Sequence, residues 1–183
     1  IDEGFRADLG FENSADLNKS IVGGNYDWWN ENSWWNRIRV RGDWDITHND
    51  DGEILERELE GYVSIRGIMQ SFVEIGFRER DRVGQRLNSG LLSVEGNTDL
   101  FFEESYSVFM ETRPNPYIYL RNFVRKGDQV DFANNRLGDQ LFVESVVDLN
   151  IGRHTQLRMR HTYSNLDVND DILFIARLSD VRL

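Results

Sequence analysis

The chain has 183 residues, of which 32 are acidic and 21 basic, so its net charge is −11, and it contains no cysteine. The acidic excess argues against broad nucleic-acid binding, which needs a basic surface, and the lack of cysteine excludes disulfides and thiolate metal sites. With 29% charged residues and no apolar run near the roughly 20 residues that a spanning helix needs, the chain is not a helical membrane bundle.

The first predicted elements flank a tryptophan-rich turn in the stretch "YDWWNENSWWN". Trp28, Trp29, Trp34 and Trp35 form two pairs there, and three interpretations compete: a sugar-stacking platform, a buried core and a membrane interface. Neighbouring residues of a strand point to opposite faces, so each pair should have one ring on each side. This disfavours a flat sugar platform and favours a girdle of interface aromatics that includes Trp44. Trp34 and Trp44 are expected to mark the two borders of one apolar band.

A strand with one apolar and one charged side follows the turn, in the stretch "NRIRVRGDWDI". Strict alternation of apolar and polar residues is the main sequence signal of a β-strand. The apolar side consists of Ile38, Val40, Trp44 and Ile46. The charged side consists of Arg37, Arg39, Arg41, Asp43 and Asp45.

The alternation recurs to the end of the chain, although the faces of residues 117–126 stay unassigned. We predict about ten strands of roughly 9–13 residues, near the length that crosses a bilayer at a tilt. Short connections are predicted at 66–67, 113–116 and 150–153, and long polar connections at 47–53, 81–98, 126–139 and 164–171. Tight turns at one end and long loops at the other are typical of outer-membrane barrels, in which only every second residue faces lipid.

The predicted fold is therefore all-β. It is an antiparallel up-and-down meander that forms a transmembrane β-barrel or part of one. We expect a single domain over residues 1–183 that is cut at both ends.

The charged sides of the strands carry both signs. Cross-strand neighbours lie about 4.5–5.5 Å apart, so that Arg41, for example, can pair with Glu58 or Glu60. Inside a narrow barrel such pairs are partly desolvated, and each charge needs its partner. A soluble sandwich with its polar face in water is the alternative. The predicted lumen residues are Arg37, Arg39, Arg41, Asp43, Glu58, Glu60, Glu74, Arg78, Arg158 and Arg160.

Three stretches, "GFRADLGF", "GGNYDWWNENSWWNRIRVRGDWDITHNDDGEILERELEGYVSI" and "ILFIARLSDVRL", resemble one protein family. It is an uncharacterised family of bacterial outer-membrane proteins, in which a family-nine-type carbohydrate-binding-like domain precedes a large β-barrel region. The resemblance implies a Gram-negative outer membrane as the location, with that N-terminal domain and further strands outside this chain. The matching positions include Phe5, Arg6, Asp8, Gly10, Phe11, Trp34, Trp35, Asn36, Trp44 and Gly52.

The sequence offers no motif for catalysis. His48, His154 and His161 are scattered, and no metalloprotease, Ser-His-Asp or phosphate-binding pattern is present. Oxygen ligands concentrate in two loops, where Ca²⁺ is a candidate because it takes about 6–8 oxygens, although solvated turns are the simpler interpretation. No other cofactor is expected. The calcium candidates are Asp50, Asp51, Glu53, Asp167, Asn169, Asp170 and Asp171.

These patterns favour an outer-membrane β-barrel that acts as a pore, a transporter or a structural scaffold, and not as an enzyme. The expected partners are outer-membrane lipid and a partner chain or missing strands that close the barrel, because proteins avoid unpaired sheet edges. The alternative function is a soluble β-sandwich that binds carbohydrate. Its partner would be a glycan and its platform the tryptophan cluster.

Overall fold

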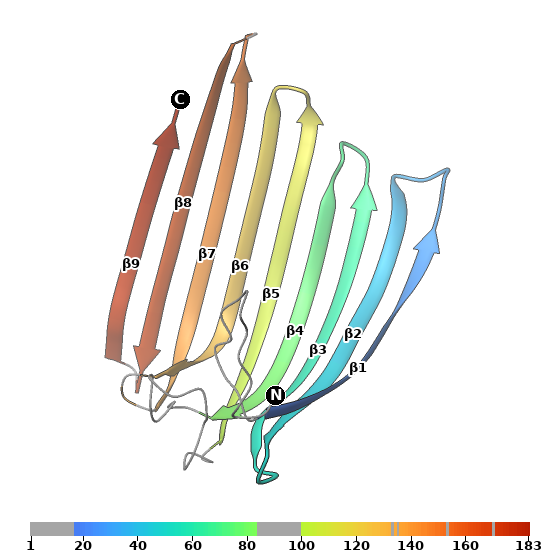
Figure 1. Ribbon diagram of the computed structural model, residues 1–183. Coiled ribbons are helices and arrows are strands. Elements are labelled where there is room, and N and C mark those ends of the chain that lie inside the picture. Colours follow the sequence, from blue (N-terminus) through green and yellow to red (C-terminus); the bar gives the residue numbers. More distant parts are fainter. Residues whose placement is uncertain (1–16, 84–99, 133, 135, 153, 170) are drawn as a thin grey trace, which may run out of the picture.

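The computed structural model describes residues 17–83, 100–132, 134, 136–152, 154–169 and 171–183. In these residues nine strands form one curved sheet, each antiparallel to its neighbours (Figure 1). The sheet keeps chain order, so neighbouring strands of the sheet are consecutive in the sequence. The strands are β1 (Leu17–Trp29), β2 (Trp35–Asn49), β3 (Ile54–Gly67), β4 (Phe72–Val83), β5 (Leu100–Asn115), β6 (Ile118–Asp131), β7 (Arg136–Ile151), β8 (Thr155–Val168) and β9 (Asp171–Arg182).

This architecture confirms the predicted all-β antiparallel meander. The described residues contain no helix, and so none long and apolar enough to cross a membrane. The strands have 12 to 16 residues, and six of the nine exceed the predicted length of roughly 9–13 residues. Within the described part of the chain, β1 and β9 each pair with one neighbour, so the sheet is open at both edges.

All four predicted long connections have wrong bounds, because strand pairing continues into each of them. β2 extends to Asn49, β6 and β7 pair as far as Asp131 and Arg136, and β8 extends to Val168. The ladder is made by backbone groups, so it tolerates polar side chains such as the facing pair Asp128 and Asp139. In the fourth, predicted at 81–98, β4 extends to Val83, and residues 84–98 lie outside the described residues.

The hairpin between β3 and β4 turns at residues 68–71 and not at 66–67 as predicted. Gly67 is still paired with Trp35, and the N–H of Ser71 donates to the carbonyl of Ile68 at 3.0 Å. Met69 and Gln70 occupy the two central positions with φ of 57° and 51°. Such a turn usually contains Asn and Gly, so the sequence signal pointed to the nearby glycine instead.

The register gives the sheet two faces of opposite character. One row of facing residues across β2–β7 is apolar, and the adjacent row across β2–β6 is mostly polar. We call the side of the first row the apolar face and the side of the second row the polar face. The first row is Val40, Val63, Ile75, Val108, Val124 and Val143, and the second is Arg41, Tyr62, Gly76, Ser107 and Arg125.

Exposure is reversed relative to an ordinary soluble sheet. On the apolar face, 59% of Ile75 and 48% of Val63 are exposed. On the polar face, Glu103 is 1% exposed and Ser64 4%. A soluble antiparallel sheet packs its apolar face on a core and presents its polar face to water. Here the described residues form a single layer, with the polar side chains as the crowded ones.

From β3 to β7, charged residues on the apolar face gather at one end of the sheet, where β4 ends and β5 begins, whereas Arg177 on β9 lies in the middle row opposite Tyr163. Arg57 pairs with Asp81 there at 2.6 Å, and Lys126 pairs with Asp139 at 2.5 Å. Arg57 is the exception to the alternation of its strand, and its facing residue Asp81 explains it. The apolar band is therefore bordered by ion pairs along this end.

Candidate functional site: the polar face

All ten predicted lumen residues lie on the polar face. Asp43 on β2 faces Glu60 on β3, which faces Arg78 on β4. On β8, Arg158 faces Asp148, and Arg160 lies two residues further along the same face. Their shared face is as the alternation predicts, and the lumen itself stays a prediction.

Asp27 anchors the edge of this face on β1. Its two carboxylate oxygens accept hydrogen bonds from Nε and Nη2 of Arg39, at 2.7 and 2.8 Å. Arg37 lies 3.9 Å from the same carboxylate. A bidentate arginine–carboxylate pair is directional as well as strong, so it fixes both side chains along the polar face.

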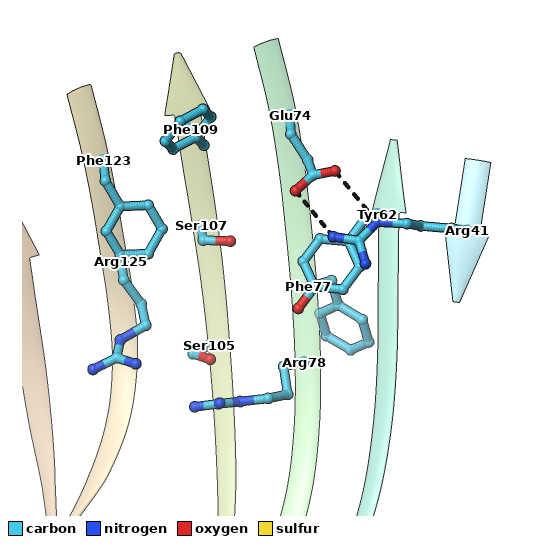
Figure 2. A pocket seen from close by; sticks show the side chains of 10 residues that line it. All are labelled: Arg41, Tyr62, Glu74, Phe77, Arg78, Ser105, Ser107, Phe109, Phe123 and Arg125. Atoms are coloured by element: carbon cyan, nitrogen blue, oxygen red, sulfur yellow. Dashed lines mark hydrogen bonds and ion pairs between the residues drawn. The ribbon is translucent and has the colours of Figure 1, made fainter. Parts of the chain in front are cut away.

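Arg41 is the centre of a second cluster (Figure 2). Its guanidinium donates to both carboxylate oxygens of Glu74, at 3.1 and 3.4 Å, and lies 4.0 Å from the centre of the Tyr62 ring. The expected partners, Glu58 and Glu60, are not the ones used. Tyr62 stands opposite Arg41 and donates its hydroxyl to Glu60 at 2.9 Å, so the guanidinium reaches across the ring to β4 instead.

Gly76 makes the position of Tyr62 possible. A Cβ built on Gly76 would lie 2.6 Å from a carbon of the Tyr62 ring and 2.6 Å from the hydroxyl of Ser107. Any side chain at this position would displace the ring, so the glycine permits the stacked arrangement of Tyr62 under Arg41. An aromatic ring covering a strand glycine also shields the exposed backbone.

Glu103 is a buried carboxylate that the sequence reasoning missed. Arg80 donates to it through Nε at 3.0 Å, Arg82 through Nη2 at 3.2 Å, and the backbone N–H of Val130 at 3.0 Å. Arg80 also lies 3.6 Å from Glu58, which joins this cluster to β3. The alternation of residues 99–111 places Glu103 on the polar face. The hydrogen bond from Val130 on β6 could not be predicted, because the sequence of β6 does not separate an apolar face from a polar one.

A further set of pairs crosses β6, β7 and β8. Arg158 donates to both oxygens of Asp148, each at 2.7 Å. Glu144 is shared between Arg160, at 3.3 Å, and Arg121. The polar face thus carries ion pairs from β1 to β8, and four of its carboxylates, those of Asp27, Glu58, Glu103 and Glu144, each lie between two arginines.

No protein-family model matches the chain, and no curated protein or solved structure is significantly similar to it. The family resemblance of the tryptophan-rich region therefore stays an expectation.

The tryptophans do not form one platform. Trp28 and Trp29 are consecutive residues of β1 and lie on opposite faces, as the alternation predicts. Trp28 packs edge-on against Tyr26 on the apolar face, with ring centres 4.7 Å apart. Trp29 lies on the polar face, where the guanidinium of Arg37 is 5.4 Å from its ring centre.

Trp34 does not mark the border of the apolar band, and this prediction is wrong. It lies in the turn between β1 and β2, before the ladder begins, so it shares no strand alternation with Trp44. Trp35 starts β2 beside a register shift. Trp44 lies on the apolar face as expected, and Trp28 occupies the opposite border in place of Trp34.

The calcium candidates do not come together. Asp50, Asp51 and Glu53 belong to the turn between β2 and β3, whereas Asp167 and Asp171 flank the turn between β8 and β9. Three of these carboxylates accept hydrogen bonds from asparagine side chains: Asn18 donates to Asp50, Asn49 to Glu53 and Asn165 to Asp167. No group of three His, Asp or Glu residues that could hold a metal occurs in the described ranges, and Asp170 lies outside them.

Proposed function

We propose that the chain forms the wall of an outer-membrane β-barrel with a charged lumen, and that it acts as a passive pore or a structural scaffold. The observation that carries the proposal is the reversed exposure of the sheet, with Ile75 59% and Glu103 1% exposed. In water an apolar layer of this extent is an aggregation hazard, whereas lipid requires it.

The extent of the strands supports this assignment. They have 12 to 16 residues, and about 9–11 tilted residues cross the hydrocarbon layer. The remaining residues project beyond it, and the ion pairs Arg57–Asp81 and Lys126–Asp139 lie on these projecting ends. Charges on the lipid side cost little near the interface and much at the midplane, so the position of the charged residues of β3–β7 at one border fits a bilayer. Arg177 on β9, in the middle row, is the exception, and its guanidinium lies against the ring of Tyr163.

One polar row interrupts the apolar face on β6–β9, and it is hydrogen-bonded within itself. The hydroxyl of Ser145 donates to the side-chain oxygen of Asn122 at 2.8 Å. Nδ1 of His161 lies 2.9 Å from the hydroxyl of Ser179. Polar groups in lipid are tolerated when protein partners satisfy them, so this row is compatible with a lipid-facing surface.

Closure of such a barrel follows from the direction of its strands. β1 and β9 run the same way, because eight antiparallel steps separate them. Direct pairing of β1 with β9 would therefore be parallel. An odd number of additional strands, from the same protein or from a partner, gives the antiparallel closure and even strand count of bacterial outer-membrane barrels.

The proposal predicts that the folded protein needs detergent, and conductance then separates a pore from a scaffold. We expect faster electrophoretic migration before boiling than after it, since a closed barrel resists unfolding in detergent. In a planar bilayer, discrete conductance steps indicate an open pore, and a folded but silent protein indicates a scaffold with a plugged lumen. A stable monomer in aqueous buffer without detergent would contradict the proposal.

A further inference from the structure

A cavity of about 280 Å³ opens on the polar face over β4, β5 and β6. Figure 2 shows its lining, with Arg78 and Arg125 on the two strands that flank the strand of Ser105. The register produces this arrangement, because Arg78 faces Ser105 and Arg125 faces Ser107. Two cations and two hydroxyls therefore surround one space from three neighbouring strands.

The cavity carries excess positive charge. Three guanidinium groups and one carboxylate line it, and Arg41 already occupies that carboxylate, Glu74, with two hydrogen bonds. Arg78 lies 3.9 Å from Glu58, beyond hydrogen-bonding distance. Among the described residues, Arg125 makes no ion pair, and its Nη2 donates to the neutral amide oxygen of Gln140 at 2.8 Å. Both guanidinium groups retain donors for an anion, in a chain whose net charge is −11.

Aromatic rings form the adjoining part of the wall. Phe109 and Phe123 face each other across β5 and β6, next to Ser107 and above the two arginines in Figure 2. These two phenylalanines add an apolar contact surface beside the charged groups of Arg78 and Arg125. The lining thus suits a ligand that has an anionic end and a flat apolar body.

We propose that this cavity binds organic anions in which a carboxylate adjoins an aromatic ring. The carboxylate lies between Arg78 and Arg125 with Ser105 as a further donor, and the ring contacts Phe109 and Phe123. The inference rests on the proposed function in one respect, because solutes reach the cavity only if the polar face lines the lumen. It gives the barrel a selectivity for aromatic carboxylates.

The test is equilibrium dialysis of labelled benzoate against the full chain folded in detergent. We expect benzoate to bind about tenfold more tightly than acetate, because only benzoate has a ring to bury. Arg125→Gln should weaken benzoate binding by about tenfold or more, the effect of losing a hydrogen bond to a charged group. Phe123→Leu should reduce the preference for benzoate over acetate.

Lys126→Gln is the matched control, because it removes the same charge from the next residue, on the apolar face. Its benzoate binding should equal that of the original chain. Equal weakening in Arg125→Gln and Lys126→Gln, or no benzoate binding by the folded protein, would overturn the proposal. Each variant is first checked for heat-dependent mobility in gels. Binding needs no bilayer, so its failure is separate from a failure of membrane insertion or conductance.

Discussion

Replacing Glu103 with alanine is expected to lower the free energy of unfolding by about 3–5 kcal/mol, the usual cost of removing one partner from a buried ion pair. Glu103 is 1% exposed and accepts hydrogen bonds from Arg80, Arg82 and the N–H of Val130. Its loss leaves two half-buried guanidinium groups and a backbone donor without their acceptor. Urea unfolding of the protein folded in detergent, followed by circular dichroism, measures the effect.

The neighbouring residue provides the control for this prediction. Glu104 points to the opposite face and accepts a hydrogen bond from the hydroxyl of Tyr106 at 2.6 Å in an exposed position. Glu104→Ala should therefore cost no more than about 1 kcal/mol. Equal costs for the two substitutions would show that the cluster around Glu103 contributes nothing special to stability.

Replacing Ile75 with arginine is the second change with a large expected effect. Ile75 is 59% exposed and lies in the middle row of the apolar face. On a surface in water such a substitution usually changes stability by no more than about 0.5 kcal/mol. At the midplane of a bilayer, arginine costs about 2–4 kcal/mol. Unfolding in lipid vesicles by guanidinium chloride measures the difference between these two environments.

Phe102→Arg is the matched substitution at the border of the band. Phe102 is 50% exposed on the same face and stands opposite Asp81, where the ion pairs gather. Arginine near the interface should cost about 0–1 kcal/mol. If Ile75→Arg costs no more than Phe102→Arg, the apolar face has no hydrocarbon layer against it.

The alternation along the chain was sufficient to predict the fold class and most of the faces. Arg37, Arg39 and Arg41 lie on one face of β2 because side chains alternate along any extended strand, whatever its tertiary contacts. The same rule placed Trp28 and Trp29 on opposite sides. These features depend only on the extended backbone of each strand, so the alternation of apolar and polar residues is enough to predict them.

Features that depend on pairing between strands were not predictable in this way. Strand ends were underestimated because backbone hydrogen bonds continue past the apolar residues, as at Asp128 and Asp139. The use of Met69 and Gln70 as turn residues follows from the register of β3 and β4, and neither residue signals a turn. The cavity was missed because one face of β6 carries Phe123 between Arg121 and Arg125, so neither face of this strand is clearly apolar or polar in the sequence.

The central claim is that the apolar face contacts lipid while the polar face contacts water. The chain has no cysteine, so a single nitroxide can be attached at Ser107→Cys or at Val108→Cys, adjacent residues on opposite faces of β5. In vesicles, the label at position 108 should be more accessible to oxygen, which concentrates in lipid, and the label at 107 to a water-soluble nickel complex. Equal accessibility of both labels to the nickel complex would contradict the membrane barrel.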